Sequence, residues 1–502
     1  MLDAGIELEP ERRRMLDQLT VQEAADWDPT ILERLKENMK PTPAGVSVKY
    51  SYGSDFPYRQ TEEYVPRELR NAKVLSSLAQ GGLSNVWGAA ILPYLANDMS
   101  DWPVARAELD AHYRSVLSFM GLAAVKDDLE SRFPLYSDSY APLRTSQQAR
   151  EFLDDLEKNR EQLQSDGFFF GRSRLAVYSR NPHNHECAAC GLCLYGCPYG
   201  LIYNSAQTLG ELRQYSNFTY VKDVIIRKLD ESGDYVKIIG RQRTNNEVVT
   251  FNASRVYVAA GVLSSTKLVL DSLEAYDQTL SLRDSQYFML PLLRYSGVPD
   301  VIDEELHTLA QAFIEISDKS LSDKTVHLQV YGYNDFYRKA LENSFSYFYP
   351  LIRFASNAFL NRFLLIQGYL HSDVSAAISL RLRAPANGSQ SKLIIEGGDN
   401  GSSRKIVRRV VAKLAEHKQQ LRAVPLKRLM KIGQPGLGNH SGGSLPMRAR
   451  PGRFETDVAG RPSGFRRVHV VDSSIFPSIP ATTITLTIMA NAHRIAAAHD
   501  QY

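Results

Sequence analysis

The segment from Phe218 to Thr266 limits the fold most, because its pattern changes from alternating strands to a strand followed by a helix. The stretches Tyr220–Leu229, Tyr235–Arg241 and Val248–Phe251 have the period of half-buried strands and are divided by turn residues. Val256–Gly261 then predicts a buried strand that ends at a small-residue turn, after which a helix opens. On this pattern and the motifs below we expect an α/β fold class.

The first residues, Met1-Leu2-Asp3-Ala4-Gly5, form an apolar stub that ends in an acidic residue and two small residues. The second strand of a dinucleotide-binding unit finishes in this way, and its carboxylate accepts hydrogen bonds from the adenosine ribose. The G-x-G-x-x-G turn of such a unit lies about 20 residues upstream of that carboxylate. No such motif precedes Asp3, so we expect the first βα unit to be missing from this sequence. We favour a true start upstream of Met1; a natural fragment is the other interpretation, and an ordinary N-terminal loop is a third.

Length and charge exclude several classes of protein. The 502 residues are enough for two or three domains. The 59 Lys and Arg against 56 Asp and Glu give a net charge of +3, which argues against binding nucleic acid through bulk charge. Every apolar run falls short of the ~18 uncharged residues of a membrane span. The nearest candidate, Phe345–Leu370, is interrupted by polar residues, so we interpret it as buried or interfacial, with shallow membrane contact as the less favoured alternative.

All the cysteines lie in one motif, Cys187-x2-Cys190-x2-Cys193-x3-Cys197-Pro198. This is the spacing of a bacterial ferredoxin run, whose fourth cysteine serves a second cluster that this chain has no cysteines to build. We therefore expect an iron–sulfur cluster, 4Fe–4S with Cys197 or a non-cysteine ligand, or 3Fe–4S. A zinc site and unmetallated cysteines are the alternatives. A local motif cannot staple the whole fold, so we favour a reducing compartment and predict a cytoplasmic location.

Several separated motifs, taken in order, resemble the glucose-methanol-choline (GMC) oxidoreductase family of FAD enzymes. They are the glycine loop Gly81–Gly88, Asp101-Trp102-Pro103 with a helix after it, Val224, Ala259–Leu263, His440–Met447, and Val470–Pro477 with Thr485–Ala490. Each motif is weak alone, and their order makes the resemblance specific.

This resemblance implies a Rossmann-like FAD-binding fold that lacks its first βα unit, together with an α+β substrate domain built on an antiparallel sheet. It implies an FAD-binding domain at residues 1–275 with a cysteine-rich insert at 183–205. A substrate-binding domain is expected at 276–430, and the rest of the FAD-binding domain, with the active-site histidine, at 431–502.

The resemblance also implies which residues bind FAD. Some relatives link the flavin to a histidine just before the Trp87 position, where this chain has Val86, so we expect noncovalent FAD. The N-terminus of the final helix, near Thr485, would face the flavin edge that carries charge when reduced. The residues expected to bind FAD are Asp3, Gly81, Gly82, Ser84, Asn85, Trp87, Gly88, Val224, Ala260, Gly261, Asp472 and Thr485.

Catalysis is expected at His440, which matches the family's active-site histidine; an imidazole suits a base because its pKa lies near neutrality. The second catalytic position, usually His or Asn, aligns with Thr483. A threonine can donate a hydrogen bond to a substrate oxygen but cannot share a proton as an imidazole does. This departure weakens the expectation of ordinary alcohol oxidation.

We therefore predict an FAD-dependent dehydrogenase that oxidises a hydroxyl group of a sugar or other small alcohol by hydride transfer to flavin N5. If iron is present, Cys187–Cys197 would relay electrons to an acceptor protein or a quinone. A flavin-dependent lyase or isomerase without net redox is one alternative, and a cofactor-free truncated binding subunit is another. Neither nucleic acid nor membrane is expected as a partner.

Overall fold

The computed structural model describes residues 1–38, 41–42, 45–46, 48–345, 349–386, 389–399 and 401–498. Part of the predicted buried or interfacial stretch, residues 346–348, lies outside the described residues. No helix among the described residues is long and apolar enough to cross a membrane.

The largest sheet is antiparallel, and its strand order is β16-β10-β13-β12-β11-β4, with β17 paired to β10. Its strands are β4 (Phe168–Arg172), β10 (Tyr287–Arg294), β11 (Ala312–Ile316), β12 (Val326–Tyr331), β13 (Phe363–Tyr369), β16 (Ala423–Pro425) and β17 (Lys431–Ile432). The edge strand β4 precedes residue 276, where we predict the substrate domain to start, and the division into domains stays a prediction.

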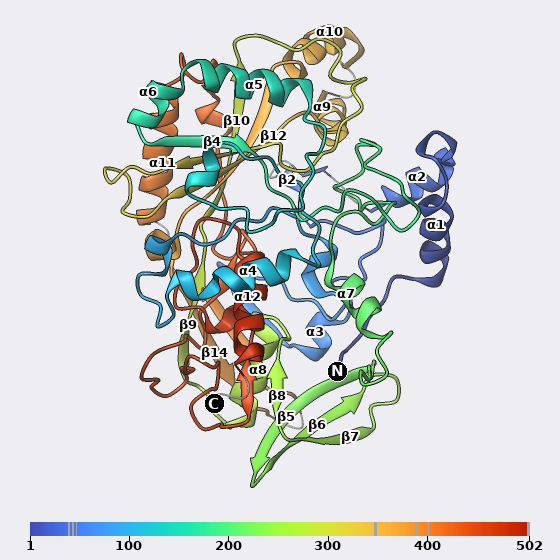
Figure 1. The fold of residues 1–502 in the computed structure, drawn as a ribbon, viewed down its shortest axis with the longest axis vertical. Coiled ribbons are helices and arrows are strands. Elements are labelled where there is room, and N and C mark those ends of the chain that lie inside the picture. The colour runs from blue at the N-terminus through green and yellow to red at the C-terminus, as the bar shows by residue number, and fades with distance from the viewer. Residues whose placement is uncertain are drawn as a thin grey trace.

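One face of this sheet is covered by helices α5 (Gln147–Lys158), α6 (Arg160–Ser165) and α11 (Gly401–Glu416), as Figure 1 shows. α11 buries Val407, Val410, Val411 and Leu414, whose spacing of three and four places them on one side of a helix. They pack with alternate residues of the strands, among them Leu328 and Val330 of β12. Since successive strand residues point to opposite faces, His327, Gln329 and Tyr331 point away from these helices.

A second sheet has the order β18-β9-β14-β15-β3 and packs against helix α8. Its β3 is parallel to β15, and its other pairs are antiparallel. The bounds are β3 (Arg67–Arg70), β9 (Thr279–Asp284), β14 (Ile378–Arg383), β15 (Lys392–Gly397), β18 (Ser441–Gly442) and α8 (Val262–Ser272).

The expected strand pattern after Phe218 is present. β5 (Val224–Ser232), β6 (Tyr235–Gln242) and β7 (Val248–Ala253) form an antiparallel meander, and β8 (Val256–Val258) follows it and leads into α8. β8 pairs in parallel with β19 (Val468–Val470) from near the end of the chain. The N-terminal stub lies beside the meander, where Leu2 bridges to Val221. Segments from near both ends of the chain therefore lie in the lower part of the molecule, around β5 to β8 (Figure 1).

The remaining elements lie outside these sheets. α12 (Thr485–Ala497) packs along α4 (Asp110–Leu117), and Tyr113 Oη lies 2.9 Å from Thr487 Oγ1 between them. The other elements are α1 (Pro10–Thr20), α2 (Pro29–Leu35), α3 (Thr61–Tyr64), α7 (Ser205–Leu212), α9 (Asp335–Phe345), α10 (Tyr349–Leu360), β1 (Pro41–Thr42) and β2 (Gly45–Val46).

Candidate active site

His440 lies in a short segment that a buried carboxylate holds in place. Asp284, the last residue of β9, accepts hydrogen bonds from Gly436 N at 2.6 Å and from Ser441 Oγ at 3.0 Å. The His440 carbonyl accepts one from Ser285 N at 3.1 Å. Burial raises the pKa of Asp284 to about 7. One side chain therefore fixes the backbone on both sides of His440.

The His440 ring stacks on Tyr369 of β13, with the ring centroids 4.7 Å apart. Its Nδ1 is buried and has no hydrogen-bond partner among the described residues. Burial lowers the pKa of His440 to about 3. The ring is therefore neutral near pH 7 and keeps a nitrogen that can accept a proton.

The sheet face under His440 is polar, although it lies inside the molecule. Register places Tyr287, Tyr369, His327 and Glu315 side by side on β10, β13, β12 and β11. His327 and Glu315 have no exposed surface, and burial raises the pKa of Tyr369 far above its ordinary value. These residues were not among those predicted from the sequence. The alternation of Val326-His327-Leu328-Gln329-Val330-Tyr331 is typical of a strand with one polar face, and it is a signal that could have found His327.

The glycine loop Gly81–Gly88 reaches the same sheet face. A Cβ atom built on Gly88 would lie 3.8 Å from the Tyr331 hydroxyl. Tyr331 and Tyr369 point to the same face, because Tyr331 is four residues after His327, the partner of Tyr369. Gly88 and His440 thus lie on one side of the sheet, as the predicted flavin site requires.

The polar side chains of the glycine loop form hydrogen bonds mostly within the loop and with residues 203–205. Asn85 Nδ2 donates to the Gly82 carbonyl at 2.8 Å, and Asn85 Oδ1 accepts from Asn204 at 2.9 Å. The Ser84 and Ser205 hydroxyls are 3.1 Å apart, and Trp87 Nε1 donates to the Tyr203 carbonyl at 2.8 Å. These contacts brace the loop.

Two glycines of the predicted site leave open space. Gly82 has a φ of +59° and Gly261 a φ of +83°, and no atom of the described residues lies within 4 Å of a Cβ built on either. Gly81, with a φ of +87°, is instead packed against Asn204 and Ala206. A flat ligand can approach the backbone closely at the two open positions.

Asp3 and Val224 lie together, as the resemblance implies for ribose and adenine contacts. Val224 N donates to the Asp3 carbonyl at 3.0 Å, and the Tyr220 hydroxyl donates to the Asp3 carboxylate at 3.0 Å. Burial raises the pKa of Asp3. Gln80, just before the glycine loop, donates to the Tyr220 hydroxyl, so the loop adjoins this pair.

Asp472 supports the turn at Ala260 and Gly261. Its carboxylate accepts from Gly261 N at 2.9 Å and from the hydroxyls of Ser265 and Ser474. Ala260 and Gly261 remain exposed. In the structure Asp472 therefore holds the turn in shape, and its predicted contact with FAD stays a prediction.

Thr483 is buried, and its hydroxyl oxygen accepts a hydrogen bond from Leu92 N at 2.9 Å. The hydroxyl proton can still be donated to another group. Thr485 is the first residue of α12, and within the described structure the residue before it, Ile484, supplies no side-chain cap. The start of α12 thus keeps backbone N–H groups for a ligand.

These residues fit FAD in chemistry: a buried carboxylate beside a tyrosine, open glycine turns and an uncapped helix start. Backbone contacts join the parts, since Gly443 N donates to the Ser473 carbonyl and so ties the His440 segment to the Asp472 segment. Ile6 bridges to Ala79 and ties the N-terminal stub to the glycine loop.

The cysteine motif lies close to the glycine loop but does not form a metal cage. Lys49 donates to the Trp87 carbonyl at 3.0 Å, and Tyr52 donates to the Cys197 carbonyl at 3.2 Å. Burial, with the nearby Cys193, raises the pKa of Cys197 to about 12. Within the described ranges, no group of three or more His, Cys, Asp and Glu side chains is placed to hold a metal ion. The four free thiols therefore do not fit a cluster in this arrangement.

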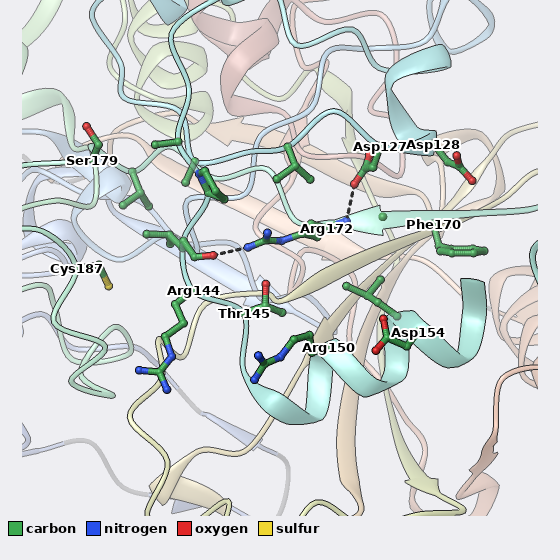
Figure 2. Close-up of a pocket in the computed structure, with 18 of the residues that line it drawn as sticks. Asp127, Asp128, Arg144, Thr145, Arg150, Asp154, Phe170, Arg172, Ser179 and Cys187 are labelled. Atoms are coloured by element: carbon green, nitrogen blue, oxygen red, sulfur yellow. Dashed lines mark hydrogen bonds between the residues drawn. The ribbon is translucent and has the colours of Figure 1, made fainter. Parts of the chain in front are cut away.

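A separate cavity of about 750 Å³ opens beside β4 and α5 (Figure 2). Arg172 and Asp127 line it, and Arg172 N donates to the Asp127 carboxylate at 2.7 Å. Cys187 also lines the cavity, whereas His440, Thr483 and the glycine loop are not part of its lining. The cavity is thus distinct from the His440 site.

Comparison with known proteins finds one family model, which matches a segment in the C-terminal part of the chain. Residues 404–492 match the family model of GMC oxidoreductases. The matched segment contains His440, Asp472, Thr483 and Thr485. No curated protein matches the chain.

Solved structures match its fold at low sequence identity. Pyridoxine 4-oxidase from Mesorbium loti is 14% identical, with a TM-score of 0.58 over 100% of this chain and 98% of that one. Formate oxidase from Aspergillus oryzae RIB40 is 12% identical, with a TM-score of 0.58 and the same coverage. An FAD-dependent oxidoreductase from Chaetomium thermophilum is 12% identical, with a TM-score of 0.53 over 85% of this chain and 87% of that one. These likenesses confirm the predicted α/β fold class, and it is the fold of GMC oxidoreductases.

Proposed function

We propose that this protein is an FAD-dependent oxidoreductase that oxidises a hydroxyl group of a sugar or other small alcohol. The observation that carries the proposal is that Nδ1 of a neutral His440 is buried without a hydrogen-bond partner among the described residues, on the sheet face that Gly88 also reaches. The match of residues 404–492 to GMC oxidoreductases and the names of the similar structures support it.

In this proposal each residue of the site has its own role. FAD, when bound, supplies the acceptor for hydride. His440 accepts the proton of the substrate hydroxyl, while Asp284 keeps the ring in place through the backbone of its segment. Thr483 donates one hydrogen bond to the substrate oxygen. Asp3 and Val224 would hold the adenosine, and the glycine turns would let the cofactor lie against the backbone.

The experiment is to add FAD to the purified protein and follow the flavin absorbance without oxygen. Bleaching by a sugar or alcohol supports oxidation, and we expect His440→Asn to slow bleaching by about 100-fold or more while FAD stays bound. Equal rates in the variant would contradict the role of His440. Turnover with unchanged flavin bands would favour a lyase or isomerase, and an absence of bound flavin would favour a binding subunit.

The electron relay stays a separate proposal. An iron–sulfur cluster on Cys187, Cys190, Cys193 and Cys197 is supported by their ferredoxin-like spacing, although the described thiols do not surround a common point. Electrons would then pass to an acceptor protein or a quinone. The test is iron and acid-labile sulfide analysis of anaerobically purified protein, with Cys190→Ser as the variant. Iron at background level in the unchanged protein would eliminate the cluster.

A further inference from the structure

Next to His440, a chain of hydrogen bonds crosses the polar face of the largest sheet. Glu315 Oε1 lies 2.5 Å from His327 Nδ1, and His327 Nε2 lies 3.2 Å from the amide nitrogen of Gln329. The Tyr331 hydroxyl then lies 2.8 Å from the amide oxygen of Gln329. Glu315 and His327 have no exposed surface, and Gln329 is also buried.

This chain of hydrogen bonds has one direction, and the Gln329 amide sets it. The amide nitrogen can only donate, so His327 Nε2 accepts from it and the ring proton lies on Nδ1, toward Glu315 Oε1. The amide oxygen of Gln329 accepts the proton of the Tyr331 hydroxyl. The Tyr331 oxygen is left with lone pairs and no proton of its own to offer.

Tyr331 is the accessible end of this chain. It is partly exposed, unlike Glu315, His327 and Gln329, and its hydroxyl approaches Gly88. Gly88 has no side chain to cover the Tyr331 oxygen. Burial raises the pKa of the Tyr331 phenol, so the hydroxyl stays protonated and keeps donating to Gln329.

We propose that Tyr331 determines substrate specificity by accepting a hydrogen bond from a second hydroxyl group of the substrate, and that Glu315 positions it through His327 and Gln329. This inference rests on the proposed function, because it places the substrate between His440 and Gly88. It narrows the substrate class to molecules with at least two hydroxyl groups, one to be oxidised at His440 and one to be recognised at Tyr331.

The first test needs neither cofactor nor turnover. Nitrogen NMR of labelled histidines in the protein without FAD reports which ring nitrogen carries the proton. His469 Nδ1 lies 2.8 Å from the Ala459 carbonyl, which can only accept, so more than one ring carries its proton on Nδ1. Among these rings we expect one whose signal is absent in His327→Asn and retained in His307→Asn, a control that replaces another buried histidine. Glu315→Gln should mix the two tautomers of this ring. A ring protonated at Nε2, or one that Glu315→Gln leaves unchanged, would overturn the direction of the chain.

The second test measures binding of two probes of equal ring size, myo-inositol and cyclohexanol, to the FAD-loaded protein by calorimetry. We expect the unchanged protein to prefer myo-inositol and Tyr331→Phe to weaken its binding by about tenfold, the effect of one lost hydrogen bond. Cyclohexanol binding should change less than twofold. Tyr333→Phe is the matched control, since its hydroxyl donates to Asp335.

The outcomes separate the two proposals. If myo-inositol is not preferred, or Tyr331→Phe keeps the preference, the inference fails even if some alcohol bleaches the flavin. If the preference depends on Tyr331 but no alcohol bleaches the flavin, the proposed oxidation fails and the recognition of hydroxyl groups stands.

Discussion

Two buried aspartates couple this protein to pH in different ways. Asp284 and Asp98 each have a pKa raised to about 7 by burial. Asp284 has bonded partners on both carboxylate oxygens, whereas Asp98 Oδ2 is buried without a partner among the described residues. The first therefore has a structural task, and the second mainly costs stability when it ionises.

Asp98→Asn should stabilise the protein increasingly as pH rises. The folded protein keeps the proton on Asp98 up to about pH 7, while an aspartate in the unfolded chain, whose ordinary pKa is 3.8, has lost it. The unchanged protein therefore loses stability relative to the variant as pH rises through this window. Urea unfolding at several pH values should show the difference growing between about pH 4 and 7 and then levelling off. A stability difference between the two proteins that shrinks as pH rises would contradict the destabilising effect of a buried charge on Asp98.

Asp284→Asn should slow flavin reduction about tenfold without loss of FAD. The carboxamide has one acceptor oxygen in place of two, so either the Gly436 N–H loses its acceptor or the Ser441 hydroxyl must change from donor to acceptor, and the His440 segment loosens. Stopped-flow bleaching measures the rate. Asp277→Asn, which changes an exposed aspartate just before β9, is the control and should react at the unchanged rate.

At the scale of elements, two glycines differ in what an added side chain would meet. Gly436, with a φ of +84°, turns the chain before His440, and a Cβ there would lie 2.6 Å from Val74 and 2.7 Å from the Lys73 carbonyl. Gly210 lies exposed in α7, where no described atom comes within 4 Å of its Cβ position.

Gly436→Ala should therefore destabilise the protein and Gly210→Ala should stabilise it. The first adds a side chain to a left-handed turn with no room, at a cost of about 1–3 kcal/mol. The second removes backbone freedom from a helix, a gain of about 0.5–1 kcal/mol. Thermal unfolding of both variants should give shifts of opposite sign, and shifts of the same sign would show that the local geometry does not decide the effect.

Elements that local motifs define could be predicted from the sequence. The meander, the strand–turn–helix at Ala260, and the C-terminal helix follow from short-range pattern and appear as expected. The alternation in Val326–Tyr331 could have predicted one polar strand face. The sheet face as a whole could not be predicted, because it depends on the register of β10 to β13 and no motif fixes that pairing. The structural role of Asp472 could not be predicted either, because its position in the motif does not show that its carboxylate accepts a hydrogen bond from Gly261 N.

At the scale of the whole molecule, an ion-paired contact joins distant parts of the chain. Arg294 of β10 is 1% exposed and donates to Glu151 and Asp155 of α5, both at 2.9 Å. α5 is thereby fixed to a sheet whose other strands mostly come later in the sequence.

Arg294→Ala should lower the free energy of unfolding by about 3 kcal/mol, because it removes a buried group and leaves two carboxylates without their cation. Arg160→Ala, which breaks ion pairs of a partly exposed arginine with Glu157 and Asp128, should cost less than about 1 kcal/mol. Urea unfolding of both variants checks the contrast, and equal losses would mean that burial of Arg294 adds nothing.

The place of β4 at the sheet edge has a consequence for synthesis. Phe168 and Phe170 leave the ribosome long before β11, whose Ile316 and Ile314 are their partners in the register. Until that strand is made, the two phenylalanines have no sheet to join, and such unpaired apolar strands favour aggregation. The nascent chain should therefore need a chaperone until β11 has been made. The last step in folding of this sheet should be the pairing of β4, its first strand to be made, with β11.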